Sequence, residues 1–107
     1  MDRQTYLGLA DAALARVARW GDQFDPDEVE ATSTDGVVTL EFADRARFVL
    51  NRQTATNQLW FAAGARAWHY DWHAERRAWL DEKDGHELLQ RLVEVVSAKV
   101  GRALPPI

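Results

Sequence analysis

The sequence predicts an α+β domain, a two-layer α/β sandwich in which two terminal helices pack on one face of an antiparallel sheet of about six strands. Near both ends of the chain, apolar residues recur at three- and four-residue spacing, whereas in the middle they alternate with polar residues. The chain has 107 residues, and 47% of them are hydrophobic. This is the length and composition of one domain with one core, so we expect a single domain over residues 1–107.

The first predicted helix spans residues 3–20. We expect Gly21 to end it, because glycine readily adopts the left-handed conformation found at helix C-termini. The apolar residues that would share one face of this helix are Tyr6, Leu9, Ala10, Ala13, Val17 and Trp20.

Strand patterning begins after an acidic stretch at residues 22–30. Val38, Leu40 and Phe42 alternate with other residues, which is the period of a β-strand. The dipeptide Asp35-Gly36 is a strong signal for a hairpin turn, so this strand should pair with the one before it. The predicted strands are residues 29–33, 37–42, 46–52, 57–63, 67–73 and 77–82.

The last segment predicts a second helix. Asp84 is expected to be its N-cap, and Glu87 three residues later would complete a capping box. Gly101 and the following Pro105-Pro106 would stop the helix. Its apolar stripe is Leu88, Leu89, Leu92, Val95, Val96 and Val100.

Composition and charge exclude several classes of function. The chain contains no cysteine, which rules out disulfides, thiolate metal sites and cysteine nucleophiles. A net charge of -4 without a dominant basic face disfavours nucleic acid as a partner. No stretch approaches the ~20 apolar residues of a membrane span, and the first residues do not resemble a signal peptide. We therefore expect a cytoplasmic protein with no membrane partner.

The acidic residues are concentrated in the first part of the chain. Residues 1–44 contain ten acids and three arginines, whereas the remainder contains seven acids and ten basic residues. Such a molecule offers an anionic end to cations or basic partners. Five of these acids lie within nine positions and have no basic residue among them: Asp22, Asp25, Asp27, Glu28 and Glu30.

These five acids, which we call the acidic ridge, are candidate metal ligands. Carboxylate oxygens are hard ligands that suit Fe³⁺, Fe²⁺, Mn²⁺, Ca²⁺ and Mg²⁺. A string of exposed acids supplies a negative field and a few single-oxygen contacts rather than a closed cage. We therefore expect weak, poorly selective binding with water completing the metal's shell. The alternative is a solvated loop whose acids only keep the domain in solution.

The second candidate site lies on the face of the predicted sheet that no helix covers. Strand parity places Leu59, Phe61, Trp68, Tyr70 and Trp72 in the core and their neighbours outside. Among the outward residues is Trp60, a large aromatic residue of the kind enriched at binding hot spots. The alternative is that Trp60 packs flat on its neighbours and only stabilises the sheet. The outward residues are Val49, Asn51, Gln53, Gln58, Trp60, His69, Asp71 and His73.

Neither a compact metal centre nor a catalytic motif is evident. His69, Asp71 and His73 share one side of a strand, but at ~3.3 Å per residue the two histidines are too far apart to bind one ion together. Surface hydrogen bonding is the simpler interpretation of both. The sequence has no nucleophile elbow, glycine-rich phosphate loop or H-E-x-x-H zinc signature. We therefore expect no enzymatic activity.

Short motifs in order along the chain resemble the frataxin family, in particular its bacterial CyaY-type members. They cover nearly the whole chain with the family's spacing, so the ordered set is specific although each string alone is weak. The matching residues are Leu9-Ala10-Asp11, Gly36-Val37-Val38-Thr39-Leu40-Glu41-Phe42, Asn51-Arg52-Gln53, Gln58-Leu59-Trp60-Phe61-Ala62, His69-Tyr70-Asp71-Trp72, Trp79 and Asp84-Gly85.

The resemblance implies a bacterial cytoplasmic protein that binds Fe²⁺ or Fe³⁺ weakly and regulates iron–sulfur cluster assembly without an organic cofactor. It implies a monomer, with iron-driven oligomers possible, whose partners are a cysteine desulfurase and its scaffold protein. One departure bears on iron: Ala18 and Arg19 stand where many relatives have acids on the first helix. The implied metal ligands are Asp11, Asp22, Asp25, Asp27, Glu28 and Glu30. The implied partner-binding residues are Asn51, Gln53, Gln58, Trp60, His69 and Asp71.

Two other functions compete with this interpretation. One is a ferroxidase or an iron-storage and delivery protein, which would need oligomers or a defined carboxylate–histidine centre. The other is a generic acidic protein-interaction domain. Whether the protein activates or inhibits its partners does not follow from the sequence.

Overall fold

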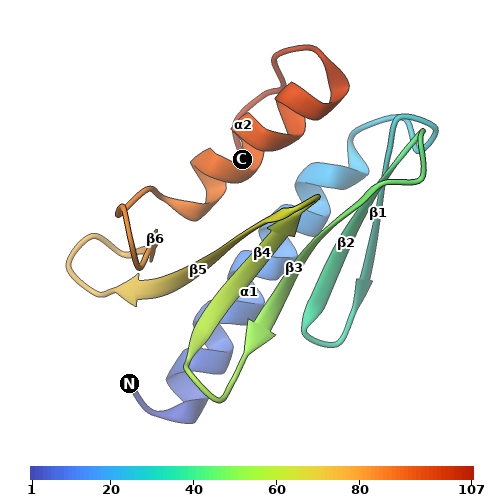
Figure 1. Ribbon diagram of the computed structural model, residues 1–107. Coiled ribbons are helices and arrows are strands. Elements are labelled where there is room, and N and C mark those ends of the chain that lie inside the picture. Colours follow the sequence, from blue (N-terminus) through green and yellow to red (C-terminus); the bar gives the residue numbers. More distant parts are fainter.

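The computed structural model describes residues 1–107 as two helices and one six-stranded antiparallel sheet (Figure 1). The strands pair in sequence order, and the helices pack on one face, α1 against β1 to β3 and α2 against β6. This confirms the predicted fold class. Neither helix combines the length and the apolarity that crossing a membrane requires. The elements are α1 (Arg3–Asp22), β1 (Val29–Thr34), β2 (Val37–Phe42), β3 (Arg47–Gln53), β4 (Gln58–Ala63), β5 (Arg66–His73), β6 (Ala78–Asp81) and α2 (Leu88–Val100).

The core lies between the helices and the inward face of the sheet. Leu59, Phe61 and Tyr70 are buried there, on the face that strand parity predicted. Trp68 and Trp72, expected beside them, are half-buried and pack against the same core. The period-two pattern therefore assigns the inner and outer residues of β4 and β5 correctly.

Tyr6 attaches α1 to the hairpin formed by β3 and β4. The Tyr6 hydroxyl donates to the carbonyl oxygen of Gln58 at 2.8 Å and accepts from the backbone N–H of Gln53 at 3.0 Å. Because Tyr6 is completely buried, this contact fixes the hairpin relative to the helix. The hairpin carries several of the residues predicted to face outward.

The prediction that Gly21 ends the first helix is wrong, because α1 continues to Asp22 and Gln23 caps it in a right-handed conformation. Gly21 instead permits a close approach between the helix and the sheet. A Cβ atom at Gly21 would lie 2.7 Å from the Cβ atom of Ala31 on β1 and 3.3 Å from a methyl group of Leu40. The glycine is needed for packing, which a propensity argument at the helix end does not detect.

The predicted start of the second helix is also wrong. Glu87, not Asp84, is the N-cap of α2, and its carboxylate accepts from the N–H groups of Leu89 at 2.8 Å and Gln90 at 2.9 Å. The Asp84 carboxylate instead accepts from the backbone N–H of His86, and both residues precede the helix. The predicted end is correct, because Gly101 caps the helix in the left-handed conformation.

Candidate functional site

The sheet face opposite the helices, here called the open face, brings residues from three strands into one row. Asn51 on β3 lies opposite Trp60 on β4, and Trp60 lies opposite His69 on β5. The rings of Trp60 and His69 are stacked, with centroids 4.1 Å apart and planes inclined by 11°. Trp60 stays partly exposed, so it packs on a neighbour and is also accessible.

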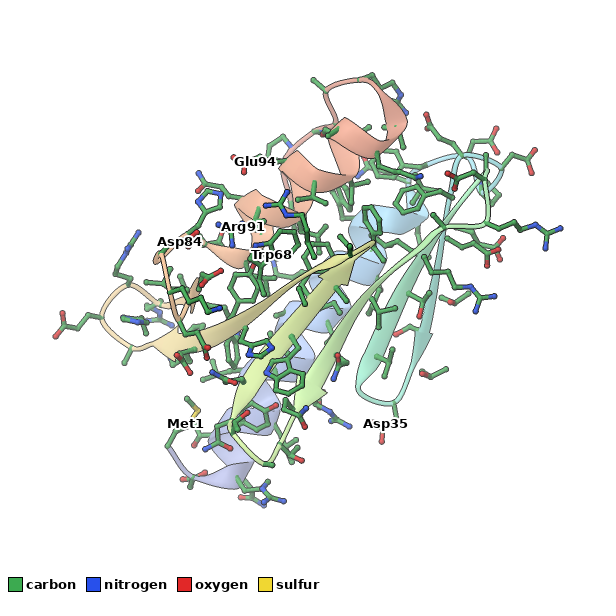
Figure 2. All side chains as sticks on the ribbon, in the orientation of Figure 1. Met1, Asp35, Trp68, Asp84, Arg91 and Glu94 are labelled. Atoms are coloured by element: carbon green, nitrogen blue, oxygen red, sulfur yellow. The ribbon has the colours of Figure 1, made fainter.

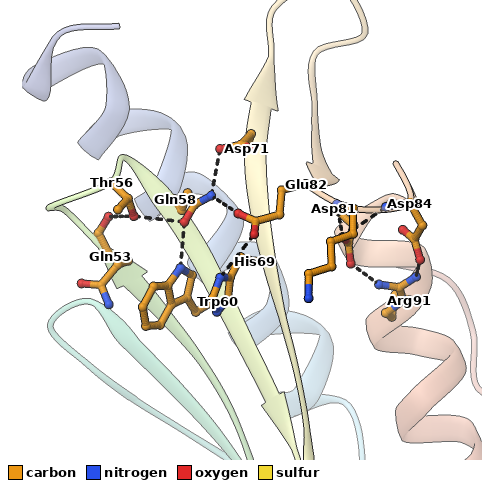
Figure 3. Close-up of polar contacts among 11 residues, drawn as sticks. Gln53, Thr56, Gln58, Trp60, His69, Asp71, Asp81, Glu82, Asp84 and Arg91 are labelled. Carbon is orange, nitrogen blue, oxygen red and sulfur yellow. Dashed lines mark hydrogen bonds and ion pairs between the residues drawn. The ribbon is translucent and has the colours of Figure 1, made fainter.

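A second row beside the first is centred on Gln58, whose side chain has four hydrogen-bond partners (Figure 3). Its amide oxygen accepts from Trp60 Nε1 at 3.0 Å and from the Thr56 hydroxyl at 3.1 Å. Its amide nitrogen donates to Asp71 at 3.0 Å and to Glu82 at 2.7 Å. Gln58 therefore joins the aromatic row to two carboxylates.

The remaining predicted docking residues make fewer side-chain contacts. Gln53 lies opposite Gln58 in the register, and only its backbone atoms take part in the hairpin's hydrogen bonds. The side-chain amide of Asn51 donates to the carbonyl oxygen of Arg52 at 2.9 Å. Both side chains are half-buried, and their amides keep donors and acceptors that no protein group uses.

Sequence reasoning missed Thr56 and Glu82, which belong to this network. Glu82 lies 3.7 Å from His69 Nδ1, and its backbone N–H donates to the carbonyl oxygen of His69. It follows β6 at the position that strand parity assigns to the open face, so this signal was present in the sequence. Thr56 lies in the β3–β4 turn, where no periodic pattern could identify it.

The acidic ridge lies where α1 ends and β1 begins. Asp22 is the last residue of α1, Asp25 and Asp27 lie in the loop that follows, and Glu30 is near the start of β1. The Asp25 carboxylate accepts from the backbone N–H of Asp27 at 2.9 Å, which orders the loop. None of the ion pairs of the structure involves Asp22, Asp25, Asp27 or Glu30.

Two of the predicted metal ligands are paired with arginines. Glu28 contacts Arg102, with oxygen–nitrogen distances of 2.6 and 3.2 Å, and this hydrogen bonding lowers the pKa of Glu28. Asp11 accepts from Arg52 at 2.9 and 3.2 Å. Asp22 is eleven positions after Asp11 on α1, or about 16.5 Å along the helix axis at 1.5 Å per residue, so Asp11 lies outside the ridge.

The pairing of β1 with β2 places one further acid, absent from the predicted ligands, next to the acidic ridge. Glu41 on β2 lies directly opposite Glu30 on β1, and like charges in this position destabilise a sheet. Arg47 contacts Glu41 at 3.5 Å and leaves Glu30 without a partner. The two-residue turn at Asp35-Gly36 already implied this pairing, because it fixes the register of the hairpin.

The carboxylates do not form a preorganised metal cage. No three histidine, aspartate or glutamate side chains in the protein are arranged to hold one ion. Asp22, Asp25, Asp27 and Glu30 are all exposed. Figure 2 shows Asp35, at the tip of the β1–β2 turn, with its side chain directed outward. Such an arrangement can attract cations through its field and bind them through one or two oxygens.

A family model described as the frataxin-like domain matches residues 1–102. The chain belongs to the frataxin family. Its relatives include proteins named iron–sulfur cluster assembly protein CyaY from two bacteria. That of Dechloromonas aromatica is 33% identical over 97% of this chain and 97% of its own length. That of Delftia acidovorans is 36% identical over 97% of this chain and 96% of its own.

Solved structures of other frataxins share the fold of this frataxin-family chain. Frataxin from Psychromonas ingrahamii matches 97% of this chain and 96% of its own, with a TM-score of 0.86 and 23% identity. Trimeric frataxin from the yeast Saccharomyces cerevisiae matches 88% of this chain and 80% of its own, with a TM-score of 0.75 and 23% identity. A further yeast structure, complexed with ferrous iron, has a TM-score of 0.63, 22% identity and coverage of 94% of this chain and 86% of its own.

Proposed function

We propose that this frataxin-family protein acts in iron–sulfur cluster assembly as a non-enzymatic, iron-responsive regulator that docks on a cysteine desulfurase and its scaffold protein. The names of its bacterial relatives support this role. The observation that carries the proposal is the row of Asn51, Trp60 and His69 on the open face. It presents an accessible aromatic ring among polar groups, which is the composition of a protein-binding hot spot. The proposed docking surface is Asn51, Gln53, Gln58, Trp60, His69 and Asp71.

The acidic ridge is the proposed site for Fe²⁺ or Fe³⁺. Its four carboxylates without ion-pair partners provide hard oxygen ligands at one end of the molecule. Because they do not converge on one point, water must complete the metal's shell, and binding should be weak. The same field would attract a basic patch on the desulfurase, so iron and partner would meet overlapping charge.

The docking role is tested by Trp60→Ala. We expect affinity for a purified desulfurase–scaffold complex to fall by about 2 kcal/mol, or roughly thirtyfold, because a tryptophan hot spot is lost. Isothermal titration calorimetry would measure it. Gln90→Ala on the exposed side of α2 is the control and should bind normally. Equal affinities for Trp60→Ala and the parent protein would refute docking through the open face.

The iron role is tested by NMR titration with Fe²⁺ under anaerobic conditions. Paramagnetic broadening should appear first at residues 22–30 and weaken in Asp25→Asn/Asp27→Asn, because two ligands without ion-pair partners are removed. Glu75→Gln in the β5–β6 turn is the matched control, as it removes an exposed acid far along the chain. Broadening that is uniform over the protein, or unchanged in the double variant, would contradict an iron site at the ridge.

A further inference from the structure

Gln58 is buried although its strand position faces the open side of the sheet. Its relative exposure is 8%, and it is one of three polar or charged residues in the protein that are buried. A glutamine amide has two donor hydrogens and an oxygen that accepts two bonds. The two bonds to each end of the amide use this capacity fully and fix which end of the amide faces which partner.

This arrangement determines how Trp60 is presented. The indole N–H is the only polar group of tryptophan, and here it is donated to Gln58. The stacked ring of His69 supports one face of Trp60. A partner that approaches the open face therefore meets the apolar ring of Trp60, because the donor of that ring is already in use.

The other half of the Gln58 amide connects Trp60 to the edge of the sheet. Asp71 on β5 and Glu82 beyond β6 both accept from the single Gln58 amide nitrogen. Without this nitrogen, two carboxylates would face each other without a shared donor, which is unfavourable. The amide thus holds together three segments around the aromatic residue (Figure 3).

We infer that Gln58 is a positioning residue of the docking surface: it acts through Trp60 and holds its ring in the orientation that a protein partner contacts, so that Trp60 binds as an apolar anchor. This inference rests on the proposed function, in which the open face is the docking surface. It divides that surface into residues that touch the partner and one that acts from beneath.

The effect on Trp60 can be measured in the free protein. In Gln58→Leu, the Trp60 indole N–H resonance, assigned with Trp60→Phe, should move upfield and exchange faster with water, because its acceptor is lost. Gln58→Asn keeps an amide that is one methylene too short and should show the same change if Gln58→Leu folds poorly. Gln53→Leu, the same substitution across the hairpin, should leave the resonance in place. An unchanged indole resonance in both Gln58 variants would overturn the inference.

Partner binding is tested with a double-mutant cycle of Gln58→Leu and Trp60→Ala. Gln58→Leu alone should weaken binding to the desulfurase–scaffold complex about five- to tenfold. In the Trp60→Ala background it should weaken binding no further, because its effect passes through the missing ring. Additive losses would show that Gln58 contacts the partner itself and would overturn the positioning role.

The cycle separates failure of this inference from failure of the proposed function. If Trp60→Ala binds like the parent protein, the docking proposal fails, whereas the indole measurement still decides whether Gln58 holds Trp60. If Trp60→Ala loses affinity and Gln58→Leu does not, docking stands and the positioning role is refuted.

Discussion

The hydroxyl groups of two buried tyrosines differ in their hydrogen bonding. Tyr6 and Tyr70 are both completely inaccessible, and burial raises the pKa of both hydroxyl groups. The Tyr6 hydroxyl has two backbone partners, whereas the Tyr70 hydroxyl has no hydrogen-bond partner in the structure. Removal of the two oxygens should therefore have different consequences.

We expect Tyr6→Phe to lower the free energy of unfolding by about 1–3 kcal/mol, because it leaves a backbone N–H and a carbonyl oxygen of the β3–β4 hairpin unpaired. Tyr70→Phe is the matched control and should change stability little, because no hydrogen bond is lost. Urea unfolding monitored by circular dichroism would measure both. Equal destabilisation by the two substitutions would show that the Tyr6 hydrogen bonds do not carry the effect.

Ion pairs of unequal burial connect α2 and the segment after it to the rest of the domain. Arg91 contacts Asp81 at 2.6 Å and Asp84 at 2.7 Å, and both Arg91 and Asp81 are buried (Figure 3). The Arg91 guanidinium also lies 5.1 Å from the ring centroid of Trp68. Arg102, which follows the helix, pairs with Glu28 in a much more exposed position.

These two arginines should differ strongly in their contribution to stability. Arg91→Leu leaves the buried Asp81 carboxylate unpaired and should cost about 3–5 kcal/mol. Arg102→Leu removes an exposed pair and should cost less than about 1 kcal/mol. Thermal and urea unfolding of the two variants give the comparison. A small effect of Arg91→Leu would mean that Asp81 is not dependent on this partner.

Three carboxylates that connect segments of the domain have pKa values below their ordinary range. Hydrogen bonding to Arg102 lowers the pKa of Glu28, and hydrogen bonding to Lys99 lowers the pKa of Asp44. The backbone N–H of His86, followed by Arg91, lowers the pKa of Asp84. Glu28 and Asp44 connect α2, or the segment after it, to distant parts of the chain, whereas Asp84 connects α2 to the segment just before it.

Stability should therefore fall in acid. A carboxyl group with a lowered folded-state pKa stabilises the fold fully above its unfolded pKa of about 4, and this stabilisation is lost as pH falls through the folded-state value. We expect the urea midpoint to be constant near neutral pH and to decline below about pH 4.5. Glu28→Gln/Asp44→Asn/Asp84→Asn should decline less steeply, whereas Glu75→Gln should follow the parent protein. Parallel curves for parent and triple variant would exclude these acids as the cause.

The sequence was sufficient for features that depend on local periodicity, and insufficient for those that depend on tertiary contacts. The six strands, their inner and outer faces and the row at Trp60 follow from a period of two. The role of Gly21 does not, because it depends on a strand ten residues away. The pairing of Glu28 with Arg102 joins residues 74 positions apart and has no signal in composition or spacing.

The close approach of Gly21 to Ala31 also limits how the nearby carboxylates can bind a cation. Asp22 follows that glycine and Glu30 precedes that alanine. The backbone next to each carboxylate is therefore held in a close contact between Gly21 and the methyl group of Ala31. An arriving ion cannot draw the helix and the strand together around itself. Closure of the protein around a bound ion is therefore excluded as a source of selectivity at this site.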